Sequence, residues 1–324
     1  MYFALIIFLA STNAVFATEH SLSSDTIFGK DYFHESIGYQ GRTANRTDSE
    51  WKWSLGYALS QSTTESNGTK LTDKTNDFSG GGGWKGWRSF DVGLNFDLSN
   101  TPAEGLSSTG GALSLTYTYQ FGNRSSKKIP AGKDKEELEM EKKKDEDNED
   151  ASESRFLPSV GVSIEGGNSA YTQAPPPQKR QSGKIQIPSV SIQQTKKSLS
   201  LFGSPWEWLY IKIGASNYTY DRNVANFLNN MESLAPLAGI TSATSGFLSK
   251  ATDWAISFYP SDLWSIDFSG SIGTNAGDGT KSKDTKLVVS YDISDSWRLG
   301  LGGQKYVSSG LTDNTLLLNV DYHF

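Results

Sequence analysis

Few side chains in this sequence can act as a general base near neutral pH. The 324 residues include three histidines, of which His20 and His34 lie near the N-terminus and His323 is the penultimate residue. There is no Cys, which excludes a disulfide scaffold and any thiolate metal site. Nucleophilic catalysis needs a nucleophile with a base beside it, so the sequence offers little for an enzyme, and we expect none.

Two other motifs could bind a ligand, and neither has the context that its chemistry needs. Gly81, Gly83 and Gly86 have the spacing of a dinucleotide fingerprint, but a strand-like pattern follows where a helix should begin, so this run predicts a flexible turn. The acidic run from Asp145 to Asp150 lacks the Gly and the terminal Glu of an ordered calcium loop. We therefore expect no cofactor and no bound metal. A pI near 5.2 also argues against nucleic acid as a partner.

From Trp51 onward, apolar and polar residues alternate in segments of about ten residues. This is the period of a strand with one apolar face. We expect antiparallel hairpins with tight turns such as 260–262, and about twelve strands, or ten if the weak segments 67–78 and 187–202 do not count. The predicted strands are 51–62, 67–78, 84–98, 111–121, 156–166, 187–202, 206–219, 250–259, 263–273, 283–293, 297–307 and 313–324.

Nearly all the Trp residues fall at the start of odd-numbered predicted strands, and therefore at one end of the sheet. Such a ring is typical of the interfacial girdle of a membrane barrel, because the indole ring is stable at the level of the lipid headgroups. A mean hydropathy of −0.47 does not exclude a membrane barrel, whose lipid-facing residues alternate with polar ones. The predicted girdle comprises Trp51, Trp53, Trp84, Trp87, Trp206, Trp208, Trp254, Trp264 and Trp297.

The remaining segments differ from the strands in composition. Residues 1–17 contain a short apolar run and a small-x-Ala cleavage site, which predicts a signal peptide. Residues 18–50 have no persistent pattern and are assigned to an N-terminal periplasmic segment, so the barrel is expected over 51–324. Within it, the charge-rich loop 122–155 is typical of disordered chain. Residues 222–238 have apolar residues at helical spacing and predict a short helix in an outer loop.

The last strand, 316–324 with the sequence LLLNVDYHF, alternates apolar residues and ends in Phe. Together with the leader, the Trp residues and the absence of Cys, it resembles the β-barrel proteins of the Gram-negative outer membrane. The resemblance implies a transmembrane antiparallel up-and-down β-barrel whose partners are the lipid bilayer and the barrel-assembly machinery, with Tyr322 and Phe324 as the assembly signal. It also implies that a barrel enzyme would need a His near the outer leaflet, where this reading places none.

If the apolar face meets lipid, the alternate residues face the lumen. There, mixed charges lie among Gly and Ser residues, a combination suited to a narrow aqueous pore that leans mildly toward cations and passes small polar solutes or ions. Two alternatives remain: a structural or adhesive barrel with a blocked lumen, and a secreted soluble β protein. The candidate lining residues are Lys52, Asp91, Asp97, Glu165, Lys212, Asp267, Lys286, Asp292, Arg298 and Asp321.

Overall fold

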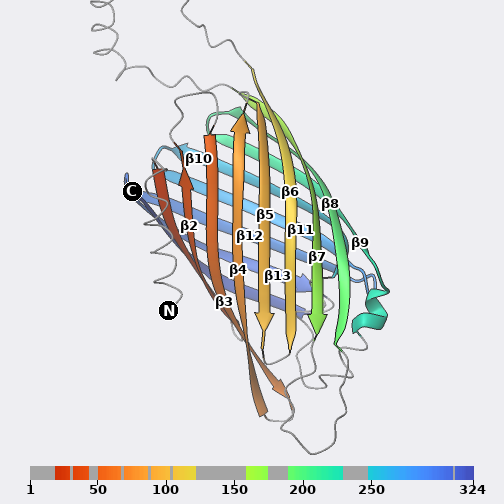
Figure 1. The fold of residues 1–324 in the computed structure, drawn as a ribbon. Helices are drawn as coiled ribbons and strands as arrows, with labels where there is room; N and C mark the ends of the chain where they lie inside the picture. The colour runs from red at the N-terminus through yellow and green to blue at the C-terminus, as the bar shows by residue number, and fades with distance from the viewer. Residues whose placement is uncertain are drawn as a thin grey trace, which may run out of the picture.

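The computed structural model is a closed antiparallel β-barrel (Figure 1), which confirms the predicted fold class. It describes residues 19–29, 32–43, 50–66, 69–86, 89–102, 105–121, 158–173, 189–228, 247–308 and 311–324. The strands are β1 (Glu19–Phe28), β2 (Tyr32–Arg42), β3 (Glu50–Ser66), β4 (Thr69–Gly86), β5 (Phe90–Thr101), β6 (Leu106–Gln120), β7 (Ser159–Gln173), β8 (Val190–Trp206), β9 (Leu209–Tyr220), β10 (Leu248–Ser261), β11 (Trp264–Asn275), β12 (Lys281–Ser294), β13 (Trp297–Ser308) and β14 (Leu311–His323). Within these ranges, no helix has both the length and the apolar composition that a membrane crossing requires.

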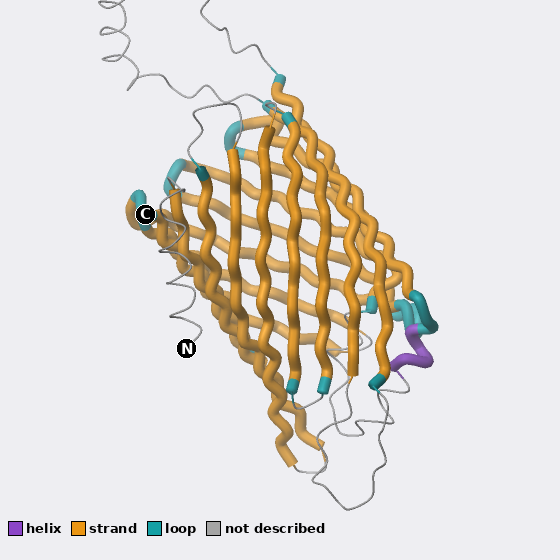
Figure 2. The backbone as a smooth tube through the Cα atoms, viewed as in Figure 1, coloured by secondary structure: helices purple, strands orange, loops and turns teal. Residues whose placement is uncertain are grey.

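The barrel closes where the first strand meets the last. β1 pairs with β14 from Ser21 opposite His323 to Phe28 opposite Leu316. His20 and Phe324 extend this seam by exchanging backbone hydrogen bonds, with N···O distances of 3.1 and 3.0 Å. Each strand pairs with its neighbour in sequence, so both ends of the sheet lie at one end of the barrel, which we call the terminal end (Figure 2).

The barrel has fourteen strands, so the prediction of about twelve was wrong. The two additional strands, β1 and β2, lie within the segment 18–50, which was therefore wrongly placed outside the barrel. Their outer face explains the error, because Ser24, Thr26 and Glu35 occupy positions where an apolar residue would mark a lipid-facing strand. Pairing with both neighbours makes β1 and β2 strands despite this weak pattern.

The glycine run 80–83 lies inside β4, so the prediction of a flexible turn there was wrong. The run pairs with β3 on one side and β5 on the other, and the chain turns only after Gly86. The ring of Phe96 lies over Gly80, where a Cβ atom would collide with it. The glycines therefore make room for neighbouring aromatic rings instead of breaking the strand.

β8 keeps one continuous register from Val190 to Gly203, so the shift predicted between Ile192 and Leu199 does not occur. The two residues simply face opposite sides of the sheet, since Leu199 is exposed and Ile192 is fully buried. β7 likewise continues to Gln173, into a stretch whose composition predicted a loop.

The two ends of the barrel differ. At the terminal end the described turns β8–β9, β10–β11 and β12–β13 are tight, whereas at the opposite end a short helix at residues 224–228 follows β9 (Figure 2). We call this opposite end the helix end. The helix confirms the first part of the helix predicted over 222–238. The predicted signal peptide 1–17 and nearly all of the charged loop 122–155 lie outside the described residues.

Large apolar side chains are exposed all around the outer face, including Leu94, Leu113, Ile213 and Leu301. Exposure of this kind on every strand pair is expected for a surface that lipid covers, not for a water-soluble monomer. The fold therefore has the apolar outer belt of a transmembrane barrel.

The facing of the strands predicts a difference between two Arg substitutions on β13. Leu301→Arg should lower the free energy of unfolding in lipid vesicles by about 2–4 kcal/mol, the cost of a cation near the bilayer midplane. Gln304→Arg places the same group on the inner face, beside Asp284, whose carboxylate already accepts a bond from Gln304 at 2.8 Å, and should cost far less. Equal losses in a urea titration would contradict the assigned facing.

Candidate pore and its charged lining

The strand register places all ten predicted lining residues on one face of the sheet, opposite the exposed apolar residues. Neighbouring pairs illustrate this: Asp267 lies beside Val288 and Ser257, whereas the adjacent Phe268 lies beside Leu287 on the outer face. The same alternation runs through every strand pair. The closed sheet therefore gathers these charged residues from eight strands around one lumen.

The sequence analysis missed further charged residues on this face. Some belong to β1 and β2, which were not recognised as strands. Lys196 was missed because the register of β8 was misread. Strict alternation, extended to every paired residue, is the signal that finds them. The additional residues are Glu19, Asp25, Arg42, Glu50, Asp77, Lys85, Lys196, Asp253, Asp284 and Asp313.

Several of these charges form ion pairs across adjacent strands. Arg298 on β13 donates two hydrogen bonds to Asp292 on β12, with distances of 2.6 Å from Nε and 3.0 Å from Nη2. Lys196 Nζ lies 2.6 Å from Glu165 Oε1. The bidentate geometry holds the guanidinium group flat against the wall, so this pair does not need to block the lumen.

Acidic groups gather around Arg298 without being neutralised by it. Asp321 is the strand partner of Arg298 on β14, and Asp267 also lies within electrostatic range of the guanidinium. Asp25 adds a further carboxylate beside Asp321 and accepts a 2.6 Å hydrogen bond from Asn319 Nδ2. This acidic cluster therefore carries net negative charge on the β11–β14 and β1 side of the lumen.

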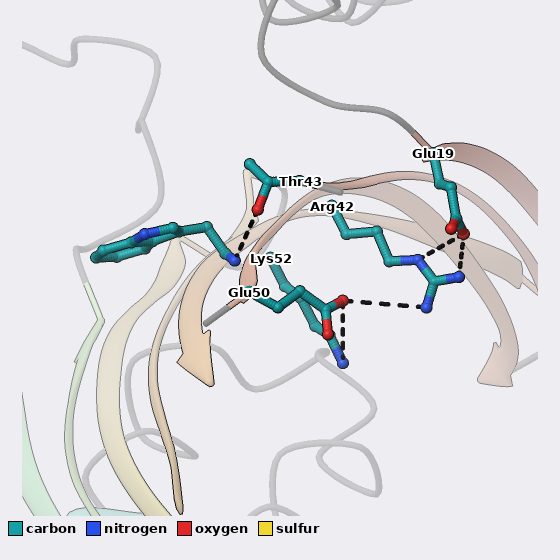
Figure 3. A network of polar contacts seen from close by, with 6 residues as sticks. Glu19, Arg42, Thr43, Glu50 and Lys52 are labelled. Carbon is teal, nitrogen blue, oxygen red and sulfur yellow. Dashed lines mark hydrogen bonds and ion pairs between the residues drawn. The ribbon is translucent and has the colours of Figure 1, made fainter. Parts of the chain in front are cut away.

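A second polar network lies at the terminal end, where Arg42 bridges Glu19 and Glu50 (Figure 3). Arg42 Nε lies 2.6 Å from Glu19 Oε2, and Lys52 Nζ lies 3.8 Å from Glu50 Oε1. The network borders a cavity of about 530 Å³ that polar side chains and the glycine run of β4 line. The rim at this end is thus open and charged.

The helix end is narrower, because an apolar cluster packs there against the inner face. Val224, Phe227 and Leu228 of the short helix pack with Phe247 against Ile192 of β8. Below them, Gln194 Nε2 donates to the Tyr220 hydroxyl at 2.7 Å, and that hydroxyl donates to the Leu248 carbonyl at 2.7 Å. We call Ile192, Val224, Phe227, Leu228 and Phe247 the mouth cluster.

The turn 276–280 contacts the mouth cluster through Ala276. Gly279 adopts a positive φ of 74°, a conformation that favours glycine. Asp278 accepts hydrogen bonds from both the amide and the hydroxyl of Thr280, at 2.9 and 2.8 Å, and these bonds lower the pKa of Asp278 below its usual range. The turn thus provides a fixed support beside the cluster.

Most of the predicted girdle lies at the strand ends of the terminal side. Trp51 faces Trp84 across β3 and β4, and Trp206 stacks on Trp208 with ring centroids 5.2 Å apart. Trp254 lies instead in the middle of β10, and Trp87 is outside the described residues. The rings of Tyr322 and Phe324 stack at the seam, 5.6 Å apart.

The histidines occupy positions that the sequence analysis did not foresee. His34 belongs to β2 at the helix end, and its Nδ1 lies 2.8 Å from the Ser60 hydroxyl on the inner face. The statement that no His lies near that end of the barrel was therefore wrong. A hydrolytic site also needs donors aimed at an oxyanion, and neither His34 nor Ser60 lines either of the two cavities described in this section and below.

No protein-family model matches the chain, and comparison with curated proteins finds no significant match. Solved structures with a similar chain course include the CymD monoaromatic hydrocarbon channel, with a TM-score of 0.49, 9% identity and coverage of 97% of this chain and 90% of that one. A loop-deletion form of OmpT from Vibrio cholerae has a TM-score of 0.44, 10% identity and coverage of 94% and 98%. The KdgM porin has a TM-score of 0.39, 10% identity and coverage of 94% and 99%. All three scores lie below 0.5, so the fold assignment rests on the strand pairing itself.

The mouth cluster predicts the effect of loosening the helix end. Phe247 is 2% exposed and contacts Tyr171, Tyr220 and Phe227. Phe247→Ala should weaken the docking of the helix by about 3–5 kcal/mol and so widen the mouth, which would raise the single-channel conductance. Phe268→Ala, on the lipid face, is the control and should leave the conductance unchanged. The same conductance in both variants would show that the cluster does not narrow the path.

Proposed function

We propose that the protein is a pore of the Gram-negative outer membrane that passes small polar solutes and ions. One observation carries the proposal: the lumen is lined by ionised and small polar side chains instead of an apolar core. Among the described residues, the buried hydrophobic side chains are the mouth cluster, Tyr39 and Leu317. A barrel of fourteen strands is wider than the eight-stranded barrels whose interiors side chains can fill.

A mild preference for cations is the second part of the proposal. Acidic residues outnumber basic ones on the lumen face, and Asp25, Asp267 and Asp321 lie close to a single Arg298. Fixed negative charge in a low-dielectric wall lowers the barrier for cations. Lys212 and Lys286 on other strands offset part of the field, which keeps the preference small.

The ion preference can be measured as a reversal potential across a salt gradient. Removing two charges with Asp267→Asn and Asp321→Asn should move the reversal potential toward anion selectivity without closing the pore, since neither carboxylate is the bidentate partner of Arg298. Glu35→Gln removes a charge from the outer face of β2 and serves as the control. The preference should fade near 1 M salt, where the Debye length falls to about 3 Å. An anion preference in the unmodified protein would contradict the assignment.

The orientation of the barrel follows from its two ends. Tight turns and both chain ends are typical of the periplasmic side, which places the helix end outside the cell. The chain between β6 and β7 then lies in the periplasm, because Gln120 and Ser159 are paired at the terminal end. A tag inserted at Asp147 should therefore resist surface labelling on intact cells and label after the cells are opened. Labelling of intact cells would mean that the orientation is inverted.

Because His34 and Ser60 are hydrogen-bonded, a hydrolytic role can be tested separately. The pore proposal predicts that Ser60 does not react with a fluorophosphonate probe, since a hydroxyl of the lumen wall lacks the oxyanion donors that activate such a nucleophile. Mass spectrometry of the folded, probe-treated protein gives the answer, with heat-unfolded protein as the blank. Labelling of Ser60 that His34→Ala abolishes would favour an enzyme over a simple pore.

A further inference from the structure

A second cavity, of about 220 Å³, lies against the lumen face of β6 to β9. Every residue that lines it faces inward by the strand register. Its wall combines hydroxyl side chains with two aromatic rings, one carboxylate and one ammonium group. A concave surface that mixes an apolar platform with a few polar groups is the usual composition of a small-molecule site.

Phe202 is the residue in this wall that the pore alone does not explain. Of the described strand residues, it is the one Phe whose register turns it toward the lumen, whereas the others face outward. Its ring lies flat over Gly161 of β7, where a Cβ atom would collide with it, and Tyr210 lies beside it with ring centroids 6.4 Å apart. An aromatic face held against the wall and bordering a cavity is suited to stacking on a flat, partly apolar ligand.

The polar groups around Phe202 suit a ligand with many hydroxyl groups. Ser198 and Ser200 precede Phe202 on the same face of β8, and serine hydroxyls can both donate and accept hydrogen bonds. Lys212 Nζ lies 3.9 Å from Asp253, beyond hydrogen-bond distance, so its donors remain available. Glu165 is held by Lys196 at 2.6 Å through Oε1, which leaves its second oxygen as an acceptor.

We propose that this cavity binds a pyranose sugar ring on its way through the barrel. The C–H face of the ring would stack on Phe202, while its hydroxyl groups bond to Ser198, Ser200 and Lys212. An amino acid fits less well, because the carboxylate that would bind its ammonium group is already paired with Lys196. The inference names the solute class of the proposed pore, and it rests on that proposal for its role in transport.

Binding can be tested without relying on an open pore. The full chain, folded in detergent, is titrated with glucose and followed by saturation-transfer NMR, with sorbitol as an open-chain polyol that lacks the flat ring. We expect saturable binding of glucose that is stronger than that of sorbitol. Phe202→Ala should weaken glucose binding about five- to tenfold, and Phe202→Trp should retain it. The control, Leu201→Ala, changes the neighbouring residue on the outer face and should have no effect.

Several outcomes would overturn the inference: no saturable binding of glucose, equal binding of glucose and sorbitol, or equal effects of the Phe202→Ala and Leu201→Ala variants. Current recordings in planar bilayers separate this inference from the pore proposal. Glucose should reduce the ion current at the concentrations at which it binds. Binding without any conductance would leave the sugar site standing and overturn the pore, whereas conductance without binding would do the reverse.

Discussion

The structure depends on one constraint: inside a lipid bilayer no water is present to satisfy an unpaired backbone N–H or C=O group. A sheet can meet this constraint only by closing, so that no edge remains. Here the closure is the pairing of β1 with β14, which the reciprocal backbone bonds of His20 and Phe324 complete. Fourteen strands, each paired on both sides, follow from that requirement.

Closure also determines where charge can lie. Because successive side chains alternate between the two faces of a strand, a belt of exposed Leu, Ile and aromatic residues on the outside forces every ionised group at that depth to the inside. There the groups pair with partners on adjacent strands, as Arg298 does with Asp292 and Lys196 with Glu165. The unpaired remainder is acidic, and this excess is the physical origin of the proposed cation preference. The mouth cluster then sets the width at one end only.

Alternation alone was sufficient to predict the fold class and the inward facing of all ten lining candidates, since both depend on a period of two. It failed where the outer face is not apolar, as at Ser24 and Glu35, and so β1 and β2 were missed. It also failed at Ile192, which looks like an outer residue in sequence but packs inward beneath the helix. The pairing of His34 with Ser60 and the platform of Phe202 on Gly161 join residues on different strands, so they require the register, which the sequence does not contain.

The central claim is that the lumen holds a continuous aqueous path. The most direct measurement is the single-channel current of the unmodified full chain, refolded and inserted in a planar lipid bilayer. The account predicts discrete, stable steps whose size rises with salt concentration and is close to linear in voltage. A barrel that is shown to be folded and inserted, by heat-modifiable migration on a gel, yet gives no steps would contradict it and would identify the lumen as blocked.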